Sequence, residues 1–294
     1  MKANSMCMSC LVSKQEKTIR DFADEQKKSD YMHELLGILY KRAQTESAPA
    51  LTVYINELFE SFWGIREDYG PLKKKYNQLL LEKEAELSAR IDNAADPVKE
   101  CIKYVCAGNY IDFSAVDNVN EETFEKLLEK AACEQVAQQE YERFAADLAA
   151  AKSLVYLTDN CGEVVLDKLF IKYMKAAYPE LKITVIVRGQ DVLNDATMED
   201  AQEVGLTELV TCIGNGDSAP GTIPQRISVR ARELMETADV IISKGQGNFE
   251  SLYGEGFNPY FLFLCKCKLF VRRFGLEQFS SVFIREERIE MKIE

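Results

Sequence analysis

The second half of the chain alternates short apolar runs with amphipathic stretches. Runs rich in β-branched residues, such as 153–157 (SLVYL) and 182–187 (KITVIV), are continuously apolar, as strands buried on both faces are. Between the runs the apolar residues recur with a helical period, over 164–177, 196–204 and 225–237. This alternation predicts a mostly parallel sheet covered on both sides, with further strands at 209–213, 239–243, 260–264 and 269–271.

The first half carries the helical period almost throughout. It runs over residues 14–40, 49–62, 71–87 and 121–150. Residues 1–150 hold 4 of the 15 glycines and residues 151–294 hold 11, which suits helices in the first part and strand–loop–helix units in the second. We therefore expect an α/β protein in which an N-terminal multihelical domain (1–150) is joined to a three-layer α/β/α domain (151–294).

The acidic composition narrows the classes of function that are open to the chain. Its 294 residues include 48 Asp and Glu against 36 Lys and Arg, a net charge of −12. An acidic surface repels phosphate backbones, so we expect no nucleic-acid partner. No apolar run approaches the roughly 20 residues of a membrane helix, and no apolar secretion signal is visible at the N-terminus. We expect no membrane partner and a cytoplasmic location.

The nine cysteines and the single histidine restrict the chemistry further. An odd number of cysteines without an export signal indicates reduced cytosolic thiols. Cys7 and Cys10 form one CxxC, whereas a structural zinc site takes four ligands, so we expect the cysteines to be mostly buried and inert. Because His33 is the one histidine, a histidine-rich zinc site is excluded and Ser-His-Asp catalysis would depend on that residue.

Polar side chains follow three of the predicted strands, at the edge where open α/β sheets bind ligands. The segments are 158–163 (TDNCGE), 188–197 (RGQDVLNDAT) and 244–250 (KGQGNFE). Asp159, Asn160 and Asp195 offer the hard oxygen ligands that Mg²⁺ and Mn²⁺ prefer. Lys244 and the glycines after it suit a phosphate group. Together they predict metal-assisted hydrolysis of a phosphate ester, although Asp and Asn after a strand also serve as helix caps and turn residues.

These segments, in this order, resemble a known family. DNCGE after a strand, NDAT followed by Asp200 and Ala201, and KGQGNFE after a later strand resemble the metal-dependent damage-control phosphatase family, formerly domain-of-unknown-function family eighty-nine. The segment 107–113 (AGNYIDF) is similar to another of its motifs, and CMSC at 7–10 resembles the N-terminal CxxC of its mainly prokaryotic subfamily. The similarity runs from residue 7 to residue 267 and so covers nearly the whole chain.

The resemblance implies an activity and a set of site residues. Family members remove phosphate from small phosphorylated metabolites, such as sugar phosphates or phosphopantetheine compounds, and some have been proposed to methylate carboxyl groups. The resemblance implies a divalent cation (Mg, Mn, Co or Ni) held by Asp159, Asn160 and Asp195. Glu163 begins the helix after the first of the three segments. The candidate substrate contacts are Asn109, Glu163, Lys244, Asn248, Glu250 and Lys266.

Asp159 is the candidate catalytic residue by either of two routes. It can hold a cation that activates water for in-line attack, or it can attack phosphorus itself and form an aspartyl-phosphate. Lys244 and Lys266 would neutralise charge in the transition state. Glu163 either orients water or complements the positive N-terminus of its helix.

Other features favour alternatives or ordinary structural roles. Two departures from the family pattern, Lys268 in place of a proline and the altered segment 68–71 (DYGP), weaken any inference about which substrate enters beside the helical domain. An S-adenosylmethionine-dependent methyltransferase would need a GxGxG-type loop where DNCGE stands, and a non-catalytic metabolite-binding or redox protein would use the CxxC.

We expect the lysine run 73–75 to be a solvated helix face and Trp63 to be a core residue. The sequence indicates no particular oligomeric state.

Overall fold

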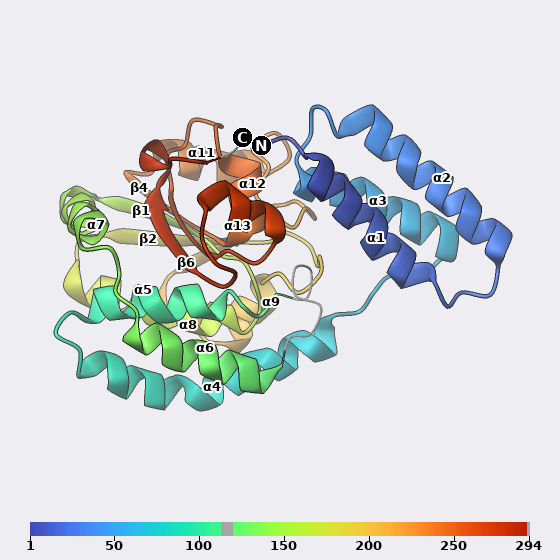
Figure 1. The fold of residues 1–294 in the computed structure, drawn as a ribbon. Coiled ribbons are helices and arrows are strands. Elements are labelled where there is room, and N and C mark those ends of the chain that lie inside the picture. The colour runs from blue at the N-terminus through green and yellow to red at the C-terminus, as the bar shows by residue number, and fades with distance from the viewer. Residues whose placement is uncertain (113–119, 293–294) are drawn as a thin grey trace.

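One six-stranded sheet organises the molecule (Figure 1). The structure is a computed structural model and describes residues 1–112 and 120–292. The strands lie in the order β3-β2-β1-β4-β5-β6, and all neighbours pair in parallel except β5 and β6, which are antiparallel. The predicted α/β class with a mostly parallel sheet is therefore confirmed. The strands are β1 (Ser153–Leu157), β2 (Lys182–Val187), β3 (Thr211–Gly214), β4 (Val240–Lys244), β5 (Tyr260–Leu264) and β6 (Ser281–Arg285).

The strand order reverses direction next to β1. From β1 the chain proceeds outward through β2 to β3, and it then returns to β4 on the other side of β1. The ends of β1 and β4 are neighbours, because Leu157 pairs with Ser243. Open α/β sheets bind ligands beyond the carboxyl ends of the strands at such a reversal. The segments that follow β1 and β4 therefore begin at the position where a ligand is expected.

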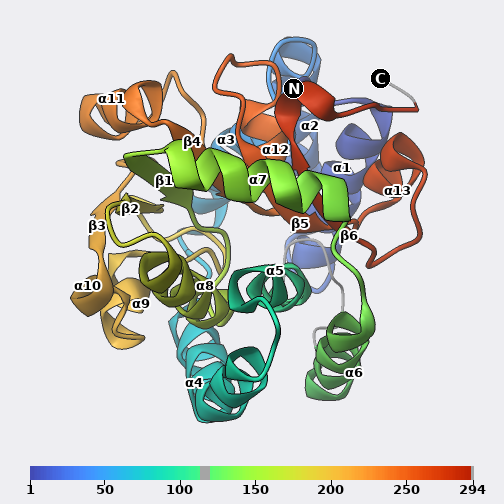
Figure 2. The same cartoon turned by 90° about the vertical axis from the view of Figure 1, so that its left-hand side faces the viewer.

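Helices cover both faces of the sheet (Figure 2). The core on one face receives side chains from α4 (Gly70–Asp92), α5 (Pro97–Gly108), α6 (Glu121–Cys133), α7 (Gln138–Ala150), α8 (Glu163–Ala177), α9 (Met198–Glu203) and α10 (Leu206–Leu209). The core on the other face receives side chains from α11 (Val229–Thr237), α12 (Gly245–Leu252) and α13 (Lys268–Phe274). This is the expected order of helix, sheet and helix layers.

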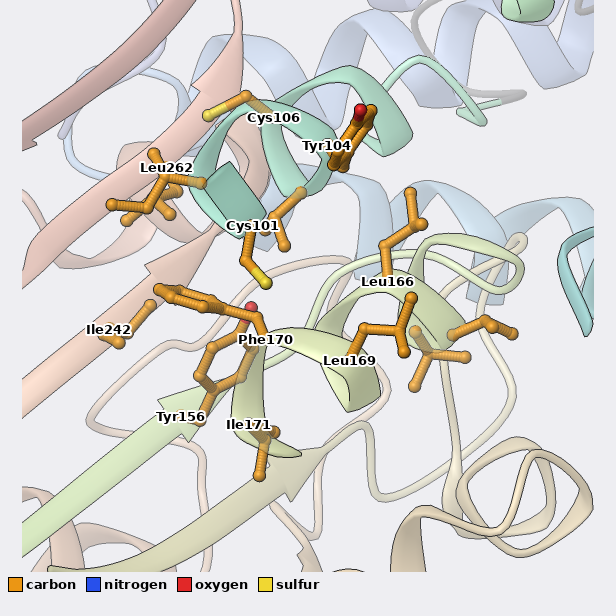
Figure 3. Close-up of a cluster of buried hydrophobic side chains, with 14 of the residues drawn as sticks. Cys101, Tyr104, Cys106, Tyr156, Leu166, Leu169, Phe170, Ile171, Ile242 and Leu262 are labelled. Carbon is orange, nitrogen blue, oxygen red and sulfur yellow. The ribbon is translucent and has the colours of Figure 1, made fainter. Parts of the chain in front are cut away.

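Alternate residues of each strand enter the two cores. Tyr156 and Leu262 lie on the face covered by α5 and α8, where Phe170 packs among them (Figure 3). Their neighbours along the strands, Val155 and Phe261, lie in the core on the opposite face. Both faces are buried under helices, which explains why the strands are continuously apolar instead of alternating with polar residues.

Three N-terminal helices form a bundle beside the sheet, which we call the helical unit (Figure 1). Leu35 packs with Leu51 and Ile55 in a small core, and Trp63 joins an aromatic cluster around Tyr31. The last helix ends at a glycine in the left-handed region, a common helix C-cap. The helices are α1 (Ser5–Ile19), α2 (Glu25–Arg42) and α3 (Ala48–Trp63).

The helices between the helical unit and β1 contribute to the core of the sheet. Tyr76 of α4, Ile102 of α5, Phe124 of α6 and Phe144 of α7 belong to the same buried cluster as the β1 side chain of Tyr156. The division of the chain into domains at residue 150 stays a prediction. Within the described residues, no helix combines the length and apolar character needed to cross a membrane.

Several local predictions need correction. Residues 269–271 form part of helix α13 and not a strand, because a short apolar run fits either element. Residues 121–150 form α6 and α7 instead of one helix, since α6 turns its apolar face to α5 whereas α7 packs against β6. The stretch 14–40 is likewise divided between α1 and α2, and β6 was not expected at all.

Candidate functional site

Backbone hydrogen bonds join the segments that follow β1 and β2. The amide of Ala196 donates to the carbonyl of Asp159 (2.7 Å), and the amide of Cys161 donates to the carbonyl of Asn194 (2.8 Å). Asn160 and Asp195 also form an isolated antiparallel bridge. The structure thus brings Asp159, Asn160 and Asp195 together at the strand ends, although Asn194, the residue before Asp195, lies 34 positions after Asn160 in the sequence.

Asp159 is held through one of its two carboxylate oxygens. Its Oδ2 accepts hydrogen bonds from Nδ2 of Asn109 (2.8 Å) and Nδ2 of Asn160 (2.7 Å). Gly245, at the start of α12, makes room for this carboxylate: its φ is +80°, and a Cβ there would lie 1.9 Å from Oδ2 of Asp159. Asn109 ends α5, so a helix far from β1 in the sequence orients the predicted catalytic residue.

Arg188 connects the two aspartates of the candidate metal site. Its Nε donates to Oδ2 of Asp195 (2.6 Å), and its Nη2 lies 3.5 Å from Oδ1 of Asp159. Its Nη1 donates to Oδ1 of Asn248 (3.0 Å) and to Oγ1 of Thr222 (3.2 Å). The side chain is 2% exposed, and its Nη2 makes no hydrogen bond within the described residues. We expected Arg188 only as part of a polar segment; the signal for its role is a basic residue directly after a buried strand.

Behind Asp159 lies a fully buried ionic network. Oε2 of Glu163 accepts hydrogen bonds from Nδ2 of Asn109 and Nδ2 of Asn160, both at 3.0 Å, and its Oε1 is paired with the ammonium of Lys244. The same ammonium lies 2.8 Å from Oδ1 of Asp167. Although burial disfavours a charged amine, the carboxylates of Asp167 and Glu163 raise the pKa of Lys244. The side chain of Lys244 is therefore a buried ammonium that is paired with two carboxylates.

Lys266 lies on the other side of Asn109. Its Nζ donates to the carbonyl of Asn109 (2.7 Å) and to Oδ2 of Asp112 (2.5 Å), while its backbone amide donates to Oε1 of Gln246 (2.6 Å). Asp112 belongs to the segment 107–113 quoted above, and Phe113 at the end of that segment lies outside the described residues. Asp112 and Gln246 both line a cavity between the helical unit and the sheet, so Lys266 lies between the site and this cavity.

The electrostatics of the site favour a bound cation. Burial, together with the nearby charges of Glu163 and Asp195, raises the pKa of Asp159 well above its usual range. Burial also raises the pKa of Asp195 to about 6, in spite of the guanidinium of Arg188. Carboxylates crowded in this way are stabilised by a proton or a cation, and two carboxylates with an amide oxygen suit a hard divalent ion. Among the described residues, no group of three or more His, Cys, Asp or Glu is arranged to hold a metal. A cation at this site would therefore need the amide oxygen of Asn160 in addition to the two carboxylates.

A cavity of about 1170 Å³ lies between the helical unit and the carboxyl edge of the sheet. Asp159, Asn160 and Asp195 are not among its lining residues; they lie behind it, 5%, 2% and 4% exposed. Its lining includes Asp112, Leu193, Gln246, Gly247 and Glu250. Leu193 lies two residues before Asp195, so a candidate metal ligand lies next to the lining of a space large enough for a small metabolite.

The prediction that the lysine run 73–75 is solvated is wrong for Lys73. Its side chain is 7% exposed, and its Nζ lies 2.7 Å from Oδ2 of Asp200 and 3.2 Å from Oδ1 of Asp191. Burial alone would lower the pKa of Lys73, but the carboxylates of Asp200 and Asp191 raise it. Lys74 and Lys75 are exposed, because only one position in three of the run faces inward from α4.

Asp200 and Asn77 make hydrogen bonds that hold the segment after Asp195 in place. Asp200 completes a capping box with Thr197 at the start of α9. Asn77 of α4 donates through Nδ2 to Oδ1 of Asp200 (3.0 Å) and accepts through Oδ1 from the amide of Gly162 (2.7 Å). One α4 side chain thus joins the segments after β1 and β2, and nothing in the local sequence around Asn77 indicates this.

The remaining predicted residues occupy two environments. Asn248 is fully buried and donates to the carbonyls of Thr158 (2.9 Å) and Lys244 (2.7 Å), so it braces the strand ends. Glu250 lines the cavity, and burial raises its pKa to about 7. Within the described residues the thiols are free, and Cys101, Cys106, Cys161 and Cys265 are buried as expected; Cys10 and Cys133 are exposed, which corrects the expectation for them. Burial raises the pKa of Cys7 to about 11, so this thiol is not activated.

Comparison with known proteins finds relatives that are similar to this chain over most or part of its length. A damage-control phosphatase of Archaeoglobus fulgidus is 29% identical over 283 residues, which are 94% of this chain and 96% of that protein. A damage-control phosphatase of Pyrococcus horikoshii is 29% identical over 187 residues, 63% of this chain and 64% of the relative. The crystal structure of a DUF89 family protein from Pyrococcus horikoshii shares the fold with a TM-score of 0.80 at 24% identity, covering 97% of this chain and 99% of that one.

The model of the damage-control phosphatase ARMT1-like domain matches residues 3–282. This match includes the helical unit, strands β1 to β5, the first two residues of β6 and every candidate site residue named above. The finer assignment to the CxxC-bearing prokaryotic subfamily stays a prediction. The family resemblance itself is confirmed: the chain belongs to the damage-control phosphatase ARMT1-like domain family.

Proposed function

We propose that the chain is a divalent-metal-dependent phosphatase that hydrolyses small phosphorylated metabolites, such as sugar phosphates or similar damaged phosphometabolites. One observation supports this above all: the oxygen-bearing side chains of Asp159, Asn160 and Asp195 lie together at the reversal of strand order, in a buried and carboxylate-rich site beneath a cavity. The relatives named as damage-control phosphatases support the same reaction class. A cytoplasmic location stays a prediction.

In this proposal Asp159, Asn160 and Asp195 hold the cation, and Mg, Mn, Co or Ni are the candidates. The residues fit the group, since the carboxylate charge at the site exceeds what Arg188 alone neutralises and all the donors are hard oxygens. When bound, the cation would polarise phosphoryl oxygens and lower the pKa of a coordinated water.

Neighbouring side chains of the chain orient the carboxylate of Asp159. Asn109 and Asn160 hold its Oδ2 with two amide donors, so Oδ1 is the oxygen that remains for a cation or for attack on phosphorus. Either route predicted from the sequence uses that oxygen. The buried Arg188 keeps Asp195 in register with Asp159, which preserves the geometry between turnovers.

The three lysines of the site serve different ends in this proposal. Lys266, between Asn109 and the cavity-lining Asp112, is placed to neutralise phosphate charge. Lys73 lines the cavity itself. Lys244 was predicted to contact substrate, and that stays a prediction; its complete burial against Glu163 and Asp167 favours a positioning role for it. Glu163, held by Lys244, then orients the two amides that fix Asp159.

The experiment is a metal-dependence assay on a generic aryl phosphate. Metal-stripped protein is resupplied with each candidate cation, and we expect turnover to return with at least one of them. Asp159→Ala should lower kcat/KM by roughly 10³-fold or more, because it removes both a ligand and the catalytic carboxylate. The control is Asp21→Ala, an equally acidic but exposed residue of the loop after α1, which should change nothing.

Two results would contradict the proposal. Turnover that ignores the metal would remove the role of the three ligands, and turnover that survives in Asp159→Ala would remove its catalytic residue. Calorimetric binding of S-adenosylmethionine would instead favour the methyltransferase alternative. A titratable dithiol formed by Cys7 and Cys10 in a protein without turnover would favour the redox alternative.

A further inference from the structure

Leu193 occupies a backbone conformation that leucine seldom adopts. Its φ is +48°, in the left-handed region that glycine enters freely and that a bulky L-residue enters at a cost. The conformation belongs to a tight turn, in which the amide of Asp195 donates to the carbonyl of Val192 (3.1 Å). Glycine would form this turn without strain, so the leucine side chain at this position needs an explanation.

The other two non-glycine residues with positive φ in the described part of the chain have evident reasons. Asn258 is of a residue type that tolerates this region, and its amide group bonds to Glu287. Phe279 places its ring edge-on against Tyr110, with centroids 5.4 Å apart, in the core of the sheet. The side chain of Leu193 is only partly buried, and it lines the cavity.

The position of Leu193 relates it directly to the site. It precedes Asn194, whose Nδ2 donates to Oδ1 of Asn160 (3.1 Å) and to the carbonyl of Ile111 (2.9 Å). It lies two residues before Asp195, which Arg188 holds in place. Leu193 therefore presents a hydrocarbon surface to the cavity from the same hydrogen-bonded turn that carries a candidate metal ligand.

Other apolar residues line the same cavity as Leu193. Val53 and Phe59 of α3 and Ile65 in the segment after it line the same space, and Val192 lines it beside Leu193. A phosphate group held at the site would leave the organic part of its ester in this space. An apolar side chain at the junction of site and cavity can distinguish one organic group from another, which a metal and lysines cannot do.

We propose that Leu193 is a specificity-determining residue, whose side chain contacts the organic part of a phosphate monoester next to the phosphate and selects for C–H surface there. This rests on the proposed phosphatase function of the same site. The strained backbone then follows from two requirements on one turn. The turn places Asp195 at the site, and it also places a bulky side chain in the lining of the cavity.

The test separates the side chain of Leu193 from its backbone strain. Leu193→Met keeps an apolar side chain of similar volume, Leu193→Ala removes the side chain but keeps a Cβ in the left-handed region, and Leu193→Gly removes both. Binding of methylphosphonate and of n-butylphosphonate to the manganese-supplied protein is measured by calorimetry. These probes share a phosphonate head and differ only in hydrocarbon, and neither is hydrolysed.

We expect the unmodified chain to prefer the butyl over the methyl compound. This preference should fall by about fivefold or more in both Leu193→Ala and Leu193→Gly, and should stay within about twofold in Leu193→Met. Thermal unfolding should separate the two truncations, with Leu193→Gly melting a few degrees above Leu193→Ala (about 2–4 °C), because only glycine relieves the strain.

The inference is overturned if the butyl-to-methyl ratio is the same in all four proteins, or if the unmodified chain does not bind the butyl compound more tightly. It is also overturned if Ala and Gly weaken both phosphonates equally, since Leu193 would then only position Asp195. Failure of the proposed function has a different signature: the unmodified chain would show no metal-dependent hydrolysis of an aryl phosphate, whatever the phosphonates do.

Discussion

The helical unit and the carboxyl edge of the sheet differ in how many polar and charged side chains they bury. In the helical unit the buried polar residues are Gln15, which accepts a hydrogen bond from Tyr31, and Ser47, which caps α3. At the edge of the sheet, acids, amides and bases are buried together: Asp159, Asn160, Glu163, Asp167, Arg188, Asp195, Lys244, Asn248 and Lys266. Burying a charge is costly unless it is paired, so such a concentration costs stability that the helical unit does not lose.

The difference shows where function constrains the sequence. The helical unit gains stability from Leu35, Leu51 and the aromatic cluster around Tyr31, as a small helical bundle does. The edge of the sheet uses the stability supplied by two large apolar cores to hold charges in a low-dielectric site. Matched substitutions in the two regions can test this contrast.

The largest expected contrast concerns ion pairs. Lys244→Met leaves Glu163 and Asp167 buried without their cation and should lower the free energy of unfolding by roughly 3–5 kcal/mol. The same change at Arg20, whose pair with Glu16 is exposed, should be close to neutral, because solvent screens that pair. Urea unfolding of both variants measures the difference. Comparable losses in the two proteins would show that the buried network is not the special feature of the sheet edge.

The second contrast concerns two glycines with similar backbone angles. Gly64 ends α3 with φ +66°, and a Cβ there would meet nothing within 4 Å. Gly245 has φ +80°, and its Cβ would lie 1.9 Å from the carboxylate of Asp159. Gly64→Ala should cost about 1 kcal/mol, the strain of the left-handed region alone. Gly245→Ala should add a steric displacement of Asp159, and we expect kcat/KM on an aryl phosphate to fall by roughly 100-fold.

The measurement compares unfolding with turnover for each glycine variant. Gly64→Ala should keep its activity within about twofold, since its Cβ points into open space. If Gly245→Ala kept its activity as well, the contact between α12 and Asp159 would have no part in positioning the candidate catalytic carboxylate.

The same contrast explains which parts of the site could be predicted from the sequence. Asp159, Asn160 and Asp195 could be predicted to lie together, because each follows a buried strand and the carboxyl ends of parallel strands share one edge. Residues 269–271 were predicted as a strand but belong to helix α13, because three apolar residues in a row fit both the strand period and the helix period. β6 was missed because its antiparallel pairing with β5 depends on tertiary contacts and not on a local pattern.

Contacts over long sequence separations account for the rest. Lys73 belongs to a run that looks solvated, and its burial depends on Asp200, a residue of α9. Asn77 and Arg188 act through partners in other segments of the chain, so no window around them predicts what they do. Charge and spacing indicate the ligands of a site, whereas the residues that orient those ligands become visible only in three dimensions.

The smallest expected effect concerns the pH dependence of stability, where the two regions should show opposite signs. Burial raises the pKa of Glu250 from 4.5 to about 7, although the guanidinium of Arg273 and the N-terminal amine oppose the shift. The folded protein then binds more protons than the unfolded one between pH 4.5 and 7, so stability is lost as the pH rises through that window. Glu250→Gln removes this loss. It should gain about 2 kcal/mol in the free energy of unfolding above pH 7, less than the full change in pKa would give, because the side chain is only partly buried, lines the cavity and is screened by solvent. Below pH 4.5 it should gain almost nothing.

Glu16 of the helical unit is the matched control, because the hydrogen bond from Arg20 lowers its pKa instead of raising it. A lowered pKa contributes stability above the unfolded value and loses it as the pH falls, so Glu16→Gln should be slightly less stable than the unmodified chain at neutral pH and equal to it in acid. Urea unfolding at a series of pH values from about 3 to 8 gives both differences, because the effect of Glu16 is lost only below its unfolded pKa. If the gain in Glu250→Gln stayed constant across that range, its cause would be packing and not ionisation, and the edge of the sheet would then differ from the helical unit in its buried ion pairs but not in the proton binding of Glu250.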